Sequence, residues 1–347
     1  MRVSWLSGRV LGNDLCGTTQ SSLADGLVEL GHEVFLYSPG RISTSKFHHI
    51  PLQNGRIKGL HSWTVVRALR SNIEEINKSE HVLIDWRLHA ITPFITTKWT
   101  LIDRGPPADR GILSLLQWKQ WAKGWNKAAC GTAVSRSHAN FIHKRTGMPL
   151  DGITILHAGV DVDKFSPGVK SGILKMVYQG RVDRHRGVLL LPKILIALHN
   201  RGIKASLNIH GEGDALNKLK QMKIPELFVT SSLDSAELAS RQSEYDIGFL
   251  PMPKDKVWEL ASPLKRSEYL ASGLVICGID HPGHRLPQSG EWLQLYSEEK
   301  FVEHCCEWLV KIERKQLNKL QNTARKYAET HLSWAYSTKL LEESMLE

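Results

Sequence analysis

The sequence lacks several features that define other classes of protein. It has no run of about 18 consecutive apolar residues, the length that a membrane-spanning helix needs. Residues 1–6 include one basic residue but no apolar stretch suited to a secretion signal. Short repeats and low-complexity stretches are also missing, and apolar residues make up 41% of the chain. This balance excludes a disordered or fibrous protein and favours a globular one.

Cysteine is scarce, with five residues at positions 16, 130, 277, 305 and 306. The odd number and the absence of metal-like pairs argue against a disulfide framework and against a zinc site. Reduced thiols are typical of the cytosol, so we expect a cytoplasmic protein. Helix-turn-helix and RNA-binding aromatic signatures are missing too, which makes nucleic acid an unexpected partner despite the basic isoelectric point.

Positive charge is abundant and unevenly spread. Lys and Arg together number 45 against 35 Asp and Glu, a formal net charge of +10. Residues 98–150 alone contain nine basic and two acidic residues, a net of +7, together with four tryptophans. A basic, Trp-rich surface indicates an anionic partner, which could be a membrane, a nucleic acid or a phosphorylated substrate.

The order of the expected elements indicates a doubly wound α/β protein. A length of 347 residues suggests two domains, at about 150 residues each. A strand over 3–6, a helix from about residue 18 to Gly31 and a strand over 34–37 open the first. The same alternation returns from residue 175, after a break at residues 161–170 that contains Pro167 and Gly168. The last 45 or so residues read as helices.

A glycine-rich turn with two arginines lies at residues 180–187. A strand that ends in glycine before a helix lets backbone amides approach a phosphate, and the helix N-terminus favours negative charge. Arg181 and Arg186 add guanidinium groups suited to a diphosphate. The alternative, from this motif alone, is a basic turn on a solvated surface.

A second candidate segment is residues 262–273, which read as a helix. Ser262 and Pro263 form a typical helix start, whose amides can bind an anion. Lys265 and Glu268 lie three residues apart on one face, and the carboxylate could accept the two hydroxyls of a ribose. The alternative is an intrahelical Lys–Glu pair that only stabilises the helix.

Taken together, the motifs resemble those of the retaining, nucleotide-sugar-dependent glycosyltransferases of the GT-B fold, family 4. Six segments match in the same order: Gly17 with residues 31–34 (GHEV), 133–135 (AVS), 157–167, 180–187, 211–213 (GEG) and 262–273. The resemblance implies two Rossmann-like domains that face a cleft. It implies an acceptor domain over residues 1–165, a donor domain over 166–325, and a C-terminal helix over 326–347 that returns to the first domain.

The resemblance also implies a chemistry. A hexose would move from a nucleotide-diphosphate sugar to an acceptor hydroxyl with retention and without a metal or cofactor. Arg181 and Arg186 would hold the diphosphate, and Glu268 the ribose. The remaining donor-binding residues would be Gly17, Gly211, Glu259, Ser262, Pro263, Leu264 and Lys265. A nucleotide-sugar epimerase or hydrolase, or a non-catalytic homologue, are the alternatives.

Some positions depart from the family pattern. Many members carry two glutamates with seven residues between them, but here Leu260 occupies the first of these positions, beside Glu259. No histidine aligns with the one that many members place near the reaction centre. We expect Asp103 and Arg104 as acceptor-side catalytic residues, with His89 as the alternative. Residues 161–163 read Asp-Val-Asp like a metal site, but they lie inside the hinge motif.

Residues 115–127 form a distinctive basic segment. The tryptophans and the lysines fall on adjacent helical stripes: Trp118, Trp121 and Trp125, and Lys119, Lys123 and Lys127. Trp beside Lys suits the surface of an anionic membrane, and would place the protein peripherally on its inner face, with a glycan or a lipid-linked acceptor. The alternative is a core helix whose tryptophans face the sheet while its lysines lie in water.

Overall fold

The computed structural model describes residues 1–12, 15–42, 45–53, 61–107, 112–170 and 172–346. The chain divides into unit 1, Met1–Gly159 with Trp334–Glu347, and unit 2, Val160–Ser333. The divisions expected at 165 and 325 therefore lie at 159 and 333. Val160 donates its amide to Leu332 O at 2.8 Å, and Arg325 Nη1 donates to Val162 O at 2.8 Å. These bonds connect the residues that follow 159 with the end of α12 (Arg314–His331), so both stretches belong to unit 2.

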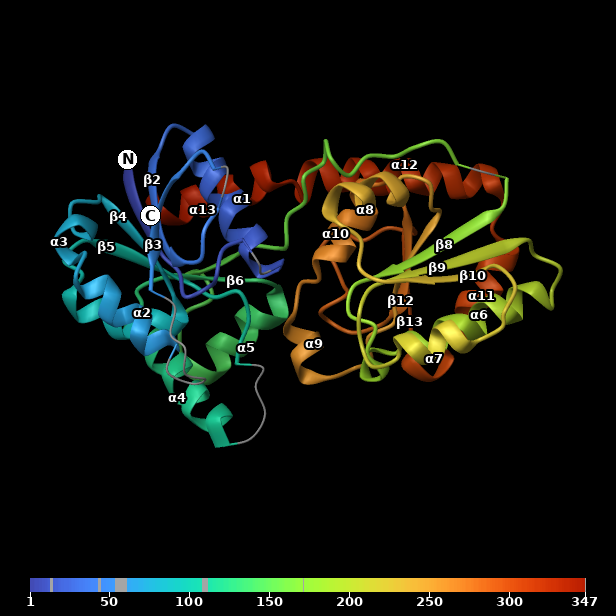
Figure 1. The fold of residues 1–347 in the computed structure, drawn as a ribbon, viewed down its shortest axis with the longest axis horizontal. Helices are drawn as coiled ribbons and strands as arrows, with labels where there is room; N and C mark the ends of the chain where they lie inside the picture. The colour runs from blue at the N-terminus through green and yellow to red at the C-terminus, as the bar shows by residue number, and fades with distance from the viewer. Residues whose placement is uncertain (13–14, 43–44, 54–60, 108–111, 171, 347) are drawn as a thin grey trace. The chain divides into compact units, whose positions relative to one another are not determined.

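Unit 1 is built on a seven-stranded parallel sheet in the order β3-β2-β1-β4-β5-β6-β7 (Figure 1). Its strands are β1 (Arg2–Leu6), β2 (Glu33–Pro39), β3 (His48–Leu52), β4 (His81–Asp85), β5 (Lys98–Ile102), β6 (Gly131–Ala133) and β7 (Ile153–Ile155). The whole of β4 is buried, as expected for a central parallel strand covered on both faces. The strand order reverses between β1 and β4, where α/β sheets usually bind ligands.

Helices cover both faces of this sheet. They are α1 (Leu15–Glu29), α2 (His61–Arg70), α3 (Ile73–Ile76), η1 (Trp86–Phe94), α4 (Ile112–Lys127) and α5 (Arg136–Thr146). The C-terminal helix α13 (Trp334–Leu346) packs against α1 (Figure 1). His32 Nε2 lies 2.8 Å from Glu342 Oε1, and a Cβ on Gly159 would approach the Trp334 ring within 2.3 Å. Close packing therefore attaches α13 to unit 1.

Unit 2 is a six-stranded parallel sheet in the order β10-β9-β8-β11-β12-β13. Its strands are β8 (Leu174–Gln179), β9 (Ala205–His210), β10 (Leu227–Thr230), β11 (Ile247–Leu250), β12 (Val275–Ile279) and β13 (Leu293–Tyr296). Its helices are η2 (Arg184–Arg186), η3 (Val188–Leu190), α6 (Leu191–His199), α7 (Leu216–Gln221), α8 (Ser235–Gln242), α9 (Lys256–Leu260), α10 (Leu264–Ala271), η4 (Glu298–Lys300), α11 (Phe301–Lys311) and α12 (Arg314–His331). The strand order reverses between β8 and β11.

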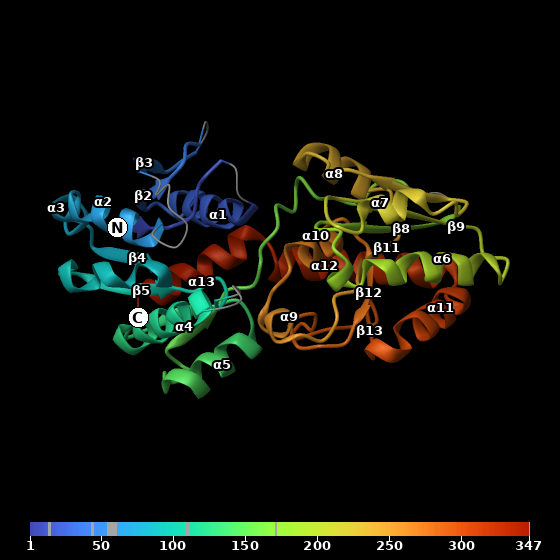
Figure 2. The same cartoon turned by 60° about the horizontal axis from the view of Figure 1, so that its bottom comes forward.

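One hydrophobic core holds unit 2 together and includes residues from every part of it. Helices α6 and α11 pack side by side (Figure 2). The helix expected over 187–201 begins only at Leu191, because two short 3-10 turns precede it. None of the helices among the described residues is long and apolar enough to cross a membrane.

Candidate functional site

The arginine turn of unit 2 lies where the strand order of its sheet reverses. Strand β8 ends at Gln179, and Gly180 turns the chain with a φ of +115°. Gly211, at the end of β9, approaches so closely that a Cβ there would lie 1.7 Å from Gly180 O. Only glycine allows this contact. The two predicted glycine motifs therefore meet at one edge of the sheet.

Both predicted diphosphate arginines lie beside one carboxylate. Arg181 donates from Nε and Nη2 to Asp183 at 3.2 and 3.1 Å, and Arg186 Nε lies 3.4 Å from Asp183 Oδ2. Burial alone would raise the pKa of Asp183, but hydrogen bonds and the arginine charges outweigh it and hold that pKa below its usual value. The Arg186 guanidinium also stacks on Trp258 of α9, 4.5 Å from the ring centroid. Our sequence analysis missed Asp183 and Trp258.

Lys265 and Glu268 lie next to this turn, on α10. The Lys265 ammonium is 4.2 Å from the centre of the Tyr178 ring, and no described residue accepts a hydrogen bond from it. Burial, reinforced by Arg186, lowers the pKa of Lys265 to about 7. Burial also raises the pKa of Glu268 to about 7, and Gln179 Nε2 donates a hydrogen bond to its carboxylate. The pair lies half-buried beside the arginines, not on a solvated helix face.

The residues that lead into α10 have separate roles. Ser262 Oγ accepts a hydrogen bond of 3.0 Å from the buried Arg266, while Pro263 and Leu264 begin the helix. Glu259 is half-buried on α9, and Leu260, where the family pattern has glutamate, is buried. The structure thus brings Arg181, Arg186, Gly211, Lys265 and Glu268 together. It records no contact that links Glu259 to them.

Asp103 does not face a substrate site. Its side chain is fully buried at the end of β5, where Oδ2 accepts hydrogen bonds from Trp121 Nε1 at 2.6 Å and Trp125 Nε1 at 2.9 Å. Burial alone would raise the pKa of Asp103, but His138 and the hydrogen bonds outweigh it and keep that pKa below its usual value. The expectation that Asp103 contacts the acceptor is therefore wrong. Its indole partners lie 18 and 22 residues further along the chain, on α4, and sequence spacing did not reveal them.

The tryptophans of α4 are core residues, so the predicted membrane stripe is wrong for them. Trp121 and Trp125 are each 1% exposed, and Trp118 packs edge-on against Trp121 with 5.4 Å between ring centres. The face of α4 that carries them turns inward, because their indoles donate to the buried Asp103. By contrast, the three lysines are exposed: Lys119, Lys123 and Lys127. The alternative of a core helix with lysines in water is the one observed.

A small polar hollow of about 200 Å³ lies in unit 1, where its strand order reverses. Arg104 lines it and donates to Leu156 O at 3.0 Å. Asp85, which follows Ile84 at the end of β4, lines it as well, and burial raises the pKa of its carboxyl. Sequence reasoning favoured Asp103 and missed Asp85. In the structure Asp85 lines this hollow, and Asp103 is not among its lining residues.

The other predicted residues of unit 1 lie elsewhere. His89 is buried and lines a neighbouring hollow of about 340 Å³. Gly17 lies in the first turn of α1, not in a loop before it, because α1 begins three residues earlier than expected. A Cβ on Gly17 would make an ordinary contact 3.5 Å from Leu11 Cδ2. A residue with a side chain could therefore replace Gly17 without backbone strain or a close contact at Cβ.

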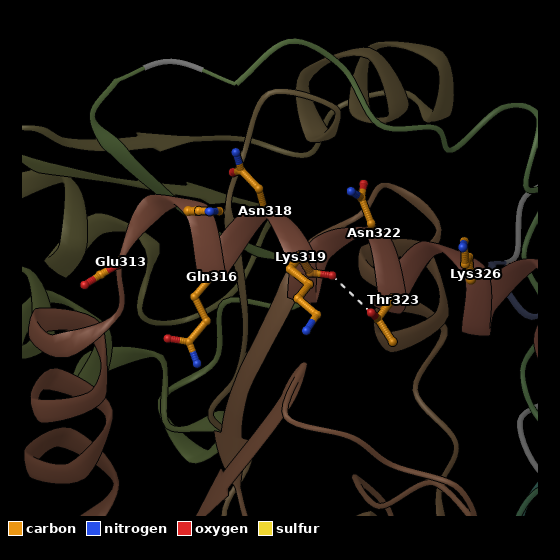
Figure 3. A pocket seen from close by; sticks show the side chains of 8 residues that line it. Glu313, Gln316, Asn318, Lys319, Asn322, Thr323 and Lys326 are labelled. Atoms are coloured by element: carbon orange, nitrogen blue, oxygen red, sulfur yellow. Dashed lines mark hydrogen bonds between the residues drawn. The ribbon is translucent and has the colours of Figure 1, made fainter.

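A hollow of about 700 Å³ runs along α12 (Figure 3). Every side chain that lines it comes from this helix or from Glu313 just before it. Asn318 and Asn322 point to one side of the helix and Gln316 to the other (Figure 3). Among the described residues, no second element contributes side chains to the lining, so we interpret this surface as a solvated helix.

Asp161, in the Asp-x-Asp triplet, forms hydrogen bonds with backbone amides. Its Oδ1 accepts hydrogen bonds from the amides of Asp163 at 3.1 Å and Lys164 at 3.0 Å. Within the described part of the chain, no three His, Cys, Asp or Glu side chains are grouped to hold a metal. The triplet shapes a turn at the start of unit 2.

Comparisons with known proteins agree with this arrangement. Residues 17–164 match the model of Glycosyltransferase Family 4. Sucrose-phosphate synthase from Thermosynechococcus elongatus has a similar structure, with a TM-score of 0.78 at 13% identity over 99% of this chain and 98% of that one. No curated protein sequence matches the chain.

Two further solved structures share the fold. The lipopolysaccharide glycosyltransferase WaaG has a TM-score of 0.69 at 13% identity over 99% of each chain. HepE from Anabaena, solved with UDP and glucose, has a TM-score of 0.69 at 10% identity over 100% of this chain and 99% of that one. The chain therefore has the GT-B fold, and its residues 17–164 resemble Glycosyltransferase Family 4, so the predicted fold and resemblance are confirmed.

Proposed function

We propose that this protein is a retaining, metal-independent hexosyltransferase that uses a nucleotide-diphosphate sugar. The observation that carries the proposal is the cluster at the end of β8, where Arg181, Arg186 and Lys265 surround one turn and Glu268 lies beside it. Two guanidinium groups and a lysine at a strand end suit a diphosphate, which carries the negative charge of the leaving group. HepE was solved with UDP, so UDP-hexoses are the first donors to test.

The proposed reaction exchanges one bond at the anomeric carbon. The bond from that carbon to the diphosphate oxygen breaks, and a bond to the acceptor oxygen forms on the same face. The acceptor proton passes to the departing phosphate. Arg181 and Arg186 stabilise the charge that develops on this leaving group, so the step needs no strong base from the protein. Glu268 accepts hydrogen bonds from the ribose hydroxyls.

A thermal-shift screen tests the donor. UDP, GDP, ADP and their hexose conjugates are each added to the protein, because a ligand that binds only the folded state raises the melting temperature. We expect one nucleotide to stand out and its shift to vanish in Arg181→Ala. Product analysis with a suitable acceptor then distinguishes transfer from hydrolysis and retention from inversion. A protein that no nucleotide stabilises would contradict the proposal.

We further propose that the enzyme works in the cytoplasm, peripherally on the inner face of an anionic membrane. The support is the exposed lysine row of α4, beside Leu115 and Leu116, which are 67% and 56% exposed. Each lysine near an anionic surface contributes about 1 kcal/mol, so three would contribute about 3 kcal/mol. We expect sedimentation with anionic liposomes at low salt and release at high salt. No sedimentation at low salt would contradict membrane docking.

A further inference from the structure

Two adjoining hollows in unit 1 differ in chemical character. The hollow of about 200 Å³ is lined by polar groups at the ends of β1, β4 and β5, and the hollow of about 340 Å³ lies between α2, η1 and α4. Trp86 and Arg87 line both. The two hollows therefore adjoin at these two residues, and one elongated molecule could extend from one into the other.

The smaller hollow is cationic. Arg9, Arg87 and Arg104 line it, against the single carboxylate of Asp85. The protein already supplies donors to this carboxylate, with Ser7 Oγ at 2.6 Å and Trp5 Nε1 at 3.2 Å. Three guanidinium groups against one satisfied carboxylate suit an anion, and guanidinium matches phosphate geometry.

Gln20 is a second, independent sign of a ligand there. Its side chain comes from α1, is fully buried and lines the smaller hollow. Among the described residues, none forms a hydrogen bond with its amide nitrogen or its amide oxygen. Buried amides are nearly always paired, so one that lines a polar hollow indicates a group that enters it.

The larger hollow exposes mainly apolar surface, although Ser62, Arg87, His89, Gln117 and Gln120 also line it. Trp63, Val66, Ala90 and Leu116 line it, together with the shared Trp86. Trp63 is 65% exposed and Leu116 is 56% exposed. Large apolar side chains that remain exposed around a hollow mark a binding surface. A purely polar sugar phosphate would leave these side chains uncovered.

We propose that the acceptor is a phosphate-bearing lipid. Its anionic group occupies the smaller hollow, against Arg9, Arg104 and Gln20, and the first part of its apolar chain lies in the larger one. Arg87 lies where the two parts join, with its guanidinium 5.2 Å from the centre of the Trp86 ring. This proposal rests on the proposed function, and it names the chemical class of the second substrate.

Equilibrium binding to the full chain tests the proposal with three probes. Decyl phosphate, used below its critical micelle concentration, carries both features, inorganic phosphate carries only the anion, and decyl maltoside carries only the chain. We expect decyl phosphate to bind at least tenfold more tightly than either of the others. Equal affinity for phosphate and decyl phosphate would overturn the lipid, and equal affinity for decyl maltoside would overturn the anion.

Variants locate the site. Arg9→Gln and Gln20→Leu should weaken decyl phosphate binding, the former roughly 10- to 100-fold because a charge-assisted bond is lost. Val66→Glu should weaken decyl phosphate but leave phosphate unchanged. Arg136→Gln is the matched control, because Arg136 is exposed on α5 and lines neither hollow. Loss of affinity in the control equal to that in Arg9→Gln would overturn the assignment.

The donor is measured on the same variants. We expect the UDP-dependent thermal shift of Arg9→Gln and Val66→Glu to match that of the wild type, which also shows that both variants fold. If the wild type binds UDP but not decyl phosphate, the lipid proposal fails and the glycosyltransferase proposal stands. If it binds decyl phosphate but no nucleotide, the proposed function fails instead.

Discussion

In both sheets polar groups gather where the strand order reverses. The two units differ in which elements supply these groups. In unit 2 the groups come mainly from one continuous turn after β8 and from the start of one helix. In unit 1 they come from α1, from the turn after β1 and from the ends of β4 and β5. The first kind of site leaves a short motif in the sequence, and the second leaves none. This difference explains why the sequence singled out Arg181 and Glu268 as candidates and did not single out Asp85.

The two carboxylates of unit 1 make the contrast sharpest. Asp85 and Asp103 end neighbouring strands, and both are at least nine-tenths buried. Asp85 lines a hollow, whereas Asp103 is enclosed by two indoles and His138. A position at the end of a strand therefore does not decide whether a carboxylate lines a hollow or is enclosed by other side chains. The helix that covers the strand decides it.

The largest expected effect concerns Asp103. Asp103→Ala leaves two buried indole donors unpaired and should cost about 3–5 kcal/mol of unfolding free energy, measured by urea denaturation. Asp103→Asn keeps one oxygen and should cost less. The exposed Asp163→Ala is the control, with a change within about 0.5 kcal/mol. A loss below 1 kcal/mol for Asp103→Ala would remove the distinction between the two carboxylates.

The next effect concerns the arginine turn of unit 2. Arg181→Ala and Arg186→Ala should each weaken binding of the donor nucleotide by roughly 1.5–3 kcal/mol, because a charge-assisted contact is lost. Isothermal titration with the nucleotide identified by thermal shift measures this loss. Arg184→Ala, on the same turn and exposed, should bind normally. If all three variants bind alike, the turn is an ordinary basic surface.

A third prediction uses pH. The pKa of Glu268 is raised to about 7 from 4.5, so the folded state holds this proton more tightly than the unfolded state does. Its contribution to stability is therefore complete below pH 4.5 and is lost as pH rises to 7, by about 1–3 kcal/mol for a half-buried group. Glu268→Gln should remove this loss while weakening nucleotide binding.

Urea denaturation at pH 5, 6, 7 and 8 measures the difference between wild type and Glu268→Gln. The exposed Glu299→Gln is its control and should follow the wild type at every pH. Parallel curves for wild type and Glu268→Gln would show that the carboxyl is not desolvated. Normal nucleotide binding by Glu268→Gln would leave only a structural role for the pair with Lys265.

The smallest effect is expected on the exposed side of α4. Changing Lys119, Lys123 and Lys127 to Gln should alter the unfolding free energy by no more than about 0.5 kcal/mol each, because all three side chains are exposed. Urea denaturation measures this, and the same variant should no longer sediment with anionic liposomes. A large loss of stability would mean that these lysines, like the tryptophans beside them, support the fold.

The sequence by itself determined the alternation of strands and helices, the two-part α/β plan and the glycine turn with its two arginines at residues 180–187. These features depend on local order, because strand patterning, turn glycines and the arginine spacing lie within a few residues of one another. Gly180 and Gly211 were recognisable for the same reason, although their mutual contact was not.

Only the tertiary structure decided which side of α4 is buried and which carboxylate of unit 1 lines a hollow. The tryptophan stripe and the lysine stripe of α4 both have regular helical spacing. Spacing alone therefore could not show which of the two faces the core. The choice follows from the buried Asp103, which accepts hydrogen bonds from the indoles and comes directly after β5, the strand before the helix. Burial is a property of elements packed together, and here the residues that impose it lie 18 and 22 residues apart, beyond the reach of helical or strand spacing.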